Sequence, residues 1–140
     1  PPRSTLFPYT TLFRSEEKTN LIVEAKFTGK EVRMSSSLEV AVYRFVQEAF
    51  SNVLKHAKAT VIQLEVAFHP DHLTISIRDN GIGFNMKLLE SKMQSGQHYG
   101  LIGMRERIEM LEGELRIDSQ YRKGTYLWME IPLKSANVRA

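Results

Sequence analysis

The chain has 140 residues, of which 42% are hydrophobic and 25% are charged, and this is the size and mixture of one globular domain with a hydrophobic core. It contains no cysteine, which excludes a disulfide framework and any zinc site built on thiolates. Of the formal net charge of +3, two positive charges come from Arg3 and Arg14, so the balance beyond residue 15 is 17 basic minus 16 acidic residues, or +1, with no basic run suited to nucleic acid.

The first fifteen residues look unlike the rest of the chain. They repeat Thr-Leu-Phe, follow neither a helical nor a strand period, and resemble translated sequencing-adapter sequence. We predict that residues 1–15 are a foreign segment or an ordinary disordered leader. The folded domain is expected to span residues 16–136, with residues 137–140 as a tail.

A short strand and a long helix are predicted next. The strand covers residues 20–27 and ends in a turn at Gly29. Ser37 is the expected N-cap of the helix, because a serine there precedes an apolar stripe with three- and four-residue steps. The stripe consists of Leu38, Val42, Phe45, Ala49 and Val53.

The second half of the chain predicts two hairpins around another helix. Alternating apolar residues at 62–68 and 73–77 indicate a β-hairpin with one buried face, and residues 85–99 indicate a loop. Helical spacing from Leu101 to Leu111 is expected to end at Gly113 in a left-handed C-cap. Two further strands, at 115–117 and 125–131, complete the pattern. Helices interleaved with antiparallel hairpins predict an α+β fold, a two-layer sandwich of helices on a mostly antiparallel sheet.

The first predicted helix carries a polar stripe beside its apolar one. Glu48, Asn52 and Lys55 are spaced four and three residues apart, so they project from one side of an ideal helix. The Asn52 carbonyl oxygen suits Mg²⁺ that bridges phosphates, Glu48 suits the orientation of a water or the acceptance of a proton, and Lys55 suits the neutralisation of phosphate charge. Taken alone, the trio also fits a solvated helix face.

The sequence Asp79-Asn-Gly-Ile-Gly follows the second strand of the first hairpin. A carboxylate that ends an apolar strand is expected at the rim of an apolar pocket, where it can accept a hydrogen bond from the amino group of adenine. Gly81 and Gly83 let the backbone come close to a flat ligand. The motif is weak by itself, because Asn-Gly after a strand is also typical of a tight turn.

A pair of glycines lies at the start of the second helix. Free N–H groups and the helix dipole favour an anion there, so Gly100 and Gly103 are candidates for contact with a triphosphate. A flexible loop that enters a core helix explains a glycine pair equally well. The sequence contains no P-loop motif and no Gly-x-Gly-x-x-Gly that opens a βαβ unit.

These motifs, in this order, resemble a known family. QEAFSNVLKHAKA, DNGIGF, HYGLIGMRERI and KGT are similar to segments of the catalytic and ATP-binding domain of bacterial sensor histidine kinases of the nitrate-sensor and degradation-sensor type. The likeness runs from about Asn20 to Leu133. It implies the Bergerat ATP-binding fold, which gyrases, heat-shock chaperones and mismatch-repair ATPases share.

The resemblance also implies roles for individual residues. It makes Asn52 the Mg²⁺ ligand, Glu48 the acid/base or water-orienting group and Asp79 the reader of adenine, with Gly81 and Gly83 shaping the adenine pocket. It places an ATP lid at residues 85–99, with Gly96 as a hinge. It implies phosphate contacts by Gly100, Leu101 and Gly103, and a water-mediated contact between Thr125 and adenine.

The expected activity is transfer of the ATP γ-phosphate to a histidine on a separate dimerisation domain, from which a response regulator takes it. Because no helical hairpin with a phosphoacceptor histidine precedes the domain, we expect the chain to bind ATP without phosphorylating itself. A nucleotide-sensing interaction module and an anti-sigma-type serine kinase remain alternatives. No apolar run is long enough to span a membrane and no secretory signal is present, so we expect this segment to be cytoplasmic without direct membrane contact, either by itself or as the cytoplasmic portion of a membrane-bound kinase.

Overall fold

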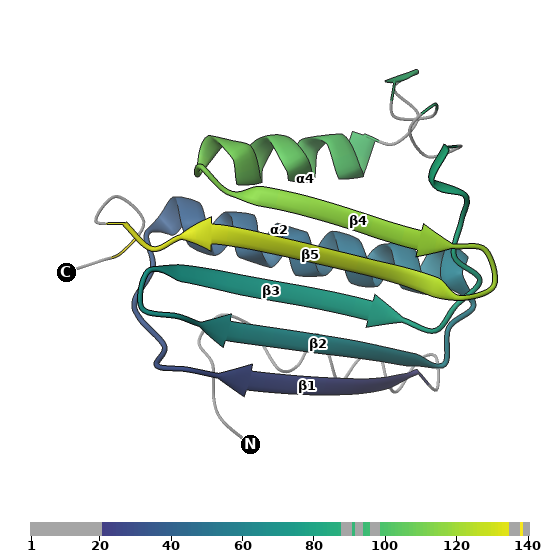
Figure 1. The fold of residues 1–140 in the computed structure, drawn as a ribbon, viewed down its shortest axis with the longest axis horizontal. Helices are drawn as coiled ribbons and strands as arrows, with labels where there is room; N and C mark the ends of the chain where they lie inside the picture. Colours follow the sequence, from purple (N-terminus) through teal and green to yellow (C-terminus); the bar gives the residue numbers. More distant parts are fainter. Residues whose placement is uncertain (1–20, 88–90, 92–93, 96–98, 135–137, 139–140) are drawn as a thin grey trace.

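The computed structural model describes residues 21–87, 91, 94–95, 99–134 and 138 (Figure 1). In chain order the elements are β1 (Ile22–Thr28), α2 (Ser36–Asn52), the π-helical segment η1 (Val53–Ala57), β2 (Val61–Phe68), β3 (His72–Asp79), α4 (Tyr99–Met110), β4 (Glu114–Gln120) and β5 (Gly124–Pro132).

Some of the predicted features lie outside the described residues. These are the leader at 1–15, the hinge at Gly96, most of the lid between residues 88 and 98, and the tail except for Val138. Val138 forms an isolated antiparallel bridge with Met34. None of the described helices is both long and apolar enough to cross a lipid bilayer.

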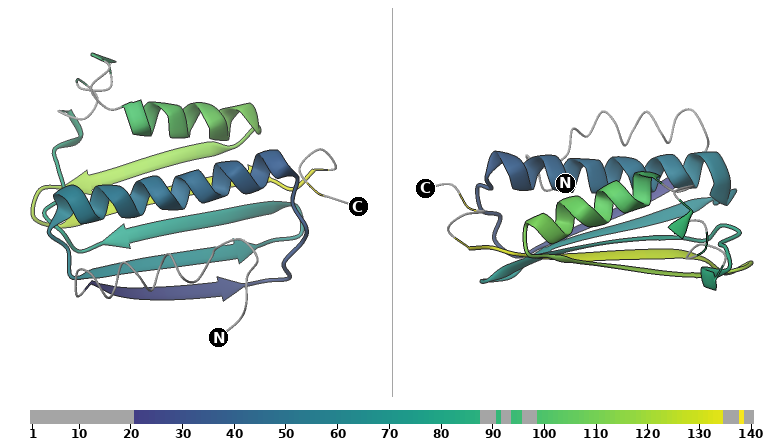
Figure 2. Two further views of the ribbon diagram at one scale, coloured as in Figure 1. Left: turned by 180° about the vertical axis from the view of Figure 1, so that it is seen from behind. Right: turned by 90° about the horizontal axis from the view of Figure 1, so that it is seen from above.

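The described strands form one mixed sheet of five strands in the order β1-β2-β3-β5-β4. β1 pairs with β2 in parallel, and the other three pairings are antiparallel. Helices α2 and α4 lie side by side over the same face of the sheet (Figure 2). The predicted α+β fold, a two-layer sandwich with a mostly antiparallel sheet, is therefore confirmed.

The hydrophobic core lies between the helices and the sheet, as the sequence periodicity predicts. The five residues of the predicted helix stripe are all buried. The hairpin of β2 and β3 pairs Leu64 with Ile77 and Val66 with Ile75, and these four side chains point into the core. Burying a side chain of this size contributes about 1.5–3 kcal/mol, so the alternation of the strands is a large part of what stabilises the sandwich.

The predicted N-cap of the first helix is wrong by two residues. Ser35, not Ser37, has the extended backbone of an N-cap, and its hydroxyl accepts a hydrogen bond from the Leu38 N–H at 3.2 Å. Three consecutive serines precede the apolar stripe, so the residue types could not distinguish among them. An N-cap side chain accepts a hydrogen bond from the free N–H three residues after it, as Ser35 does, whereas Ser37 already lies within the helix.

The predicted left-handed cap at Gly113 is also wrong. The left-handed residue after α4 is Glu112, with a φ of 61°. Gly113 is needed instead because a side chain there would clash with its neighbours. A Cβ on Gly113 would lie 2.5 Å from the Glu130 carbonyl oxygen and within 2.9 Å of the Ile108 and Ile131 side chains. The chain passes from α4 to β4 so close to β5 that no side chain fits.

Candidate functional site

The predicted site residues gather at one end of the molecule. The C-terminal ends of α2 and β3, the N-terminal end of α4 and the start of β5 all lie at this end (on the right in Figure 1). They bring together Asn52, Asp79, Gly100 and Thr125, which span more than 70 positions of the sequence. The fold therefore assembles most of the predicted residues into one region.

Asp79 is the last residue of β3 and one of two polar side chains that are buried among the described residues. Its side chain is 6% exposed, and Oδ1 accepts a hydrogen bond from the Gly81 N–H at 2.8 Å. Burial raises the pKa of the Asp79 carboxyl, while the backbone N–H groups of Gly81 and Thr125 oppose that shift. These donors stabilise the carboxylate form, which accepts hydrogen bonds and donates none.

The other buried polar side chain is Ser119 of β4, which is 5% exposed. Its hydroxyl oxygen accepts a hydrogen bond from the Phe84 N–H at 2.9 Å and donates one to the Gly124 carbonyl oxygen at 3.1 Å. It also lies 2.8 Å from the Thr125 hydroxyl. Ser119 thus joins the segment after Asp79 to the start of β5. The sequence signal for a buried polar side chain was the position of Ser119 in the strand alternation, because it follows the inward-facing Leu115 and Ile117.

Two glycines of the motifs lie where backbone segments approach each other closely. Gly83 has a φ of +62°, and a Cβ there would lie 2.1 Å from the Gln120 carbonyl oxygen. Gly124 has a φ of +96°, and a Cβ there would lie 2.1 Å from the Asp79 carbonyl oxygen. Both allow backbone segments to pack against each other in conformations that L side chains rarely adopt. Gly81, which is buried, instead donates its N–H to Asp79.

Asn80 is a residue whose role the sequence reasoning missed. Its Oδ1 accepts hydrogen bonds from the N–H groups of Thr60 and Val61 at 2.9 and 3.0 Å, and its Nδ2 donates to the Thr60 hydroxyl at 2.8 Å. The partners lie about 20 positions away in the chain. Asn80 therefore fastens the end of β3 to the start of β2 and holds Asp79 in place.

Replacing Asn80 by Ala is expected to lower the free energy of unfolding by about 1.5–4.5 kcal/mol, because three hydrogen bonds are lost at about 0.5–1.5 kcal/mol each. Urea denaturation followed by circular dichroism measures the change. Asn85→Ala, which removes a single exposed side-chain contact with the Lys87 N–H, is the matched control and should cost less than about 1 kcal/mol. Equal losses for the two variants would contradict the role of Asn80.

The polar stripe of the first helix is only partly preserved. Glu48 and Asn52 lie on adjacent turns of α2 and are half-buried. Lys55 lies in η1, where the helix widens into π geometry, and its side chain is exposed. The ideal spacing of 100° per residue therefore ends before Lys55.

Glu48 lies against the first turn of α4. A Cβ on Gly100 would lie 2.1 Å from Oε1 of Glu48, so the absence of a side chain at Gly100 leaves room for the carboxylate. Leu101, the next candidate for contact with phosphate, is buried in the core with 6% of its surface exposed, so only its backbone can contact a ligand. Gly103 has open space around its Cα apart from the tip of Arg107.

Asn52 has no hydrogen-bond partner among the side chains of the described residues, and its side chain does not cap η1. Its amide oxygen is therefore available to a ligand. No group of three His, Cys, Asp or Glu side chains that could hold a metal occurs in the described part of the chain. An amide oxygen fits Mg²⁺ that takes its remaining ligands from water and phosphate.

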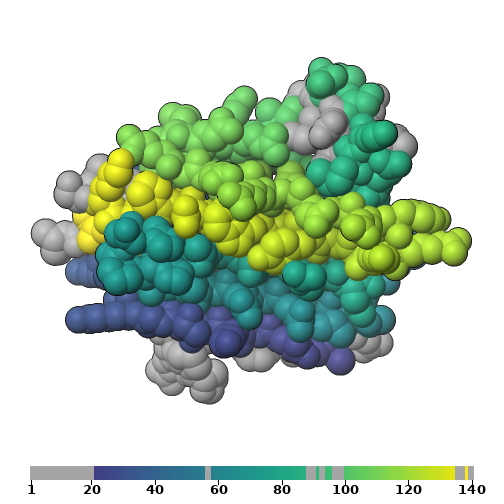
Figure 3. Space-filling model, viewed as in Figure 1, coloured from purple at the N-terminus to yellow at the C-terminus, as the bar shows by residue number. Residues whose placement is uncertain are grey.

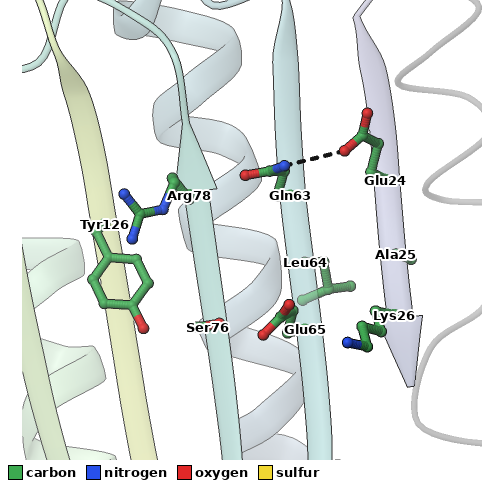
Figure 4. A pocket seen from close by; sticks show the side chains of 9 residues that line it. All are labelled: Glu24, Ala25, Lys26, Gln63, Leu64, Glu65, Ser76, Arg78 and Tyr126. Atoms are coloured by element: carbon green, nitrogen blue, oxygen red, sulfur yellow. Dashed lines mark hydrogen bonds between the residues drawn. The ribbon is translucent and has the colours of Figure 1, made fainter. Parts of the chain in front are cut away.

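A separate hollow of about 330 Å³ lies on the opposite face of the sheet, which the helices leave uncovered (Figures 3 and 4). Charged and polar side chains of β1, β2 and β3 surround it, and the Glu24 carboxylate accepts a hydrogen bond from Gln63. On the same face the Arg78 guanidinium lies 4.5 Å from the centre of the Tyr126 ring. This lining differs from the apolar walls that an adenine needs.

Comparison with known proteins identifies the family. Residues 37–135 match the family model described as "Histidine kinase-, DNA gyrase B-, and HSP90-like ATPase". The chain is 39% identical over 104 residues to the signal transduction histidine-protein kinase/phosphatase DegS of Bacillus subtilis, and 34% identical over 101 residues to the oxygen sensor histidine kinase NreB of Staphylococcus carnosus. These matches cover 74% and 72% of this chain but only 26% and 28% of the relatives.

A solved structure has the same fold. The histidine kinase domain from the Erythrobacter litoralis EL346 blue-light activated histidine kinase superposes with a TM-score of 0.71 at 18% sequence identity, covering 91% of this chain and 60% of that one. The matched family model includes Asn52, Asp79, Gly100 and Thr125, the residues that the fold gathers at one end. The chain therefore belongs to the family of histidine kinase-, DNA gyrase B- and HSP90-like ATPases, as a domain of the sensor histidine kinase type.

Proposed function

We propose that this chain binds ATP with Mg²⁺ and acts as the catalytic half of a two-component sensor kinase in the cytoplasm. The observation that carries the proposal is Asp79, a buried carboxylate held by backbone donors at the end of an apolar strand. A buried acceptor of this kind matches the amino group of adenine, and apolar side chains of the core would provide the environment for the ring.

The other residues have distinct roles in this proposal. Asn52 would hold Mg²⁺ through its amide oxygen, and the metal would neutralise phosphate charge. Gly100, Leu101 and Gly103 would offer backbone N–H groups of the first turns of α4 to the phosphates. Gly81 and Gly83 would shape the adenine pocket, and Thr125, which is half-buried beside Asp79, would contact its edge.

In the proposed reaction, a histidine nitrogen of a separate dimerisation domain attacks the γ-phosphorus. The new P–N bond forms as the bond between the γ-phosphorus and the bridging oxygen breaks, and ADP leaves. Glu48, which lies beside Gly100, would accept the imidazole proton or orient a water. Lys55 is exposed and would neutralise phosphate charge from the rim. A response regulator would then take the phosphoryl group from the histidine.

Replacing Asn52 by Ala is expected to remove most of the effect of Mg²⁺ on ATP affinity, because the variant has no side-chain oxygen for the metal. Titration calorimetry with ATP, in Mg²⁺ and in EDTA, measures it. The wild type should bind about tenfold or more tightly with Mg²⁺, and Asn52→Ala about equally in both buffers. Gln63→Ala, which removes an exposed amide on the outer face of the sheet, should keep the wild-type response. A full Mg²⁺ response in Asn52→Ala would contradict its role as ligand.

The kinase activity itself is tested by mixing the chain with a helical hairpin that bears a phosphoacceptor histidine, in the presence of γ-labelled ATP. Acid-labile label on that histidine supports the proposal. Binding of ATP without transfer would instead indicate a nucleotide-sensing interaction module. Label on serine would indicate a serine kinase, and release of phosphate alone would indicate a free ATPase.

A further inference from the structure

The Ser119 hydroxyl makes three hydrogen-bond contacts, and it can be the donor in only one of them. A hydroxyl has one hydrogen and two lone pairs. Ser119 donates its hydrogen to the Gly124 carbonyl oxygen at 3.1 Å, so its other contacts must be accepted ones. The first comes from the Phe84 N–H at 2.9 Å, and the second comes from the Thr125 hydroxyl at 2.8 Å.

This arrangement favours one direction for the Thr125 hydroxyl. With the Ser119 hydrogen directed to the Gly124 carbonyl oxygen, the 2.8 Å contact is a hydrogen bond when Thr125 donates its own hydrogen to Ser119. The Thr125 oxygen then offers only lone pairs to any other group. Ser119 is buried at 5% exposure, so water does not compete readily for these bonds.

The Asp79 carboxylate is a second acceptor beside the Thr125 hydroxyl oxygen. The backbone N–H of Thr125 donates to the Asp79 carboxylate, and Gly124 packs against the Asp79 carbonyl group. The edge of the site formed by Asp79 and Thr125 therefore presents two acceptors and no side-chain donor. A water that bridges the two oxygens donates both of its hydrogens to them and presents a lone pair to the base, so the base still meets an acceptor.

We infer that Ser119 is a positioning residue that sets the base specificity of the site, by holding Thr125 as an acceptor so that the site takes purines with a 6-amino group and rejects those with a 6-oxo group. This inference rests on the proposed function. The amino group of adenine has two hydrogens for two acceptors. A 6-oxo group at the same place sets an acceptor against the Thr125 oxygen and leaves both unpaired, and a site built for one hydrogen-bond pattern rejects its opposite strongly.

The experiment compares the dissociation constants of ATP and inosine triphosphate, which carries a 6-oxo group and lacks the 2-amino group of guanine. In Ser119→Ala the Thr125 hydroxyl is free to turn and donate to the 6-oxo group. The ratio of the inosine triphosphate Kd to the ATP Kd is expected to fall by about two- to tenfold, the size of one net hydrogen bond. If Ser119 serves only to stabilise the hairpin, both constants rise by the same factor and the ratio stays the same, which would overturn the inference.

Three further variants sharpen the test. Ser76→Ala makes the same change on the outer face of β3 and should leave the ratio unaltered. Adding Ser119→Ala to Thr125→Val should produce no further change in the ratio, because valine has no hydroxyl to release. Ser119→Cys keeps the volume with a weak acceptor, and a fall in the ratio there supports the inference even if Ser119→Ala does not fold.

The two proposals fail in different ways. A wild-type chain that does not bind ATP overturns the proposed function. A chain that binds ATP in the wild type but keeps its ratio in both Ser119 variants overturns only the role of Ser119.

Discussion

Replacing Asp79 by Asn is expected to weaken ATP binding by about 30- to 4000-fold, the 2–5 kcal/mol that the loss of one partner of a buried charged hydrogen bond costs. The amide can still accept from the Gly81 N–H through its oxygen. Its NH₂ group, however, replaces the second acceptor oxygen of the carboxylate and meets the adenine amino group with another donor. Titration calorimetry with ATP measures the loss.

The fold of Asp79→Asn should be retained, because burial of the carboxylate disfavours its charged form and the neutral amide avoids that cost. Circular dichroism and urea denaturation check this point. Asp118→Asn is the matched control, since Asp118 is an exposed aspartate of β4. It should bind ATP like the wild type. Unchanged ATP affinity in Asp79→Asn would refute the assignment of Asp79 as the adenine acceptor.

Replacing Gly124 by Ala is expected to lower the free energy of unfolding by about 3 kcal/mol or more, and to weaken ATP binding with it. A φ of +96° is strained for alanine, which costs about 1–3 kcal/mol. The new Cβ would also lie 2.1 Å from the Asp79 carbonyl oxygen, so β5 must move away from β3. That movement separates Thr125 from Asp79. Urea denaturation gives the stability, and calorimetry gives the affinity.

Gly103→Ala is the matched control for stability. Gly103 lies inside α4, where its nearest neighbour for a Cβ is the flexible tip of Arg107 at 3.6 Å. Alanine in a helix interior is favoured over glycine by about 0.5–1 kcal/mol, so this variant should be more stable than the wild type. Opposite signs for the two substitutions would show that backbone conformation and space, not the loss of glycine, determine the effect. Similar stabilities would mean that Gly124 does not pack as described.

The secondary structure was largely predictable, because each element carries its own period. Alternation gave the hairpin of β2 and β3, and helical spacing gave the buried stripe of α2. The ends of helices were less predictable. Ser35, Ser36 and Ser37 are chemically identical candidates for a cap, and only the backbone around Ser35 is extended. At the other helix the left-handed residue is Glu112, whose side chain gives no signal for it.

The candidate site was predictable where its residues form compact motifs, and less so where they act through distant partners. The motifs predicted Asp79, Asn52 and the glycines, and the fold brings them to one end of the molecule. Asn80 looked like part of a turn, although its side chain bonds to residues about 20 positions away. Ser119 bonds to the backbone of Phe84 across 35 positions, and no local pattern indicates that pairing.

The sequence by itself determined the α+β architecture and the membership of the ATPase family, and it predicted Asp79 as the main acceptor of the site. Periodicity and compact motifs are local properties, which can be read along the chain. The tertiary structure alone decided that Glu48 lies against Gly100, that Gly124 must lack a side chain beside Asp79, and that the Thr125 and Ser119 hydroxyls lie 2.8 Å apart. Close approach and hydrogen-bond direction depend on which distant segments meet, and only the folded chain fixes those contacts.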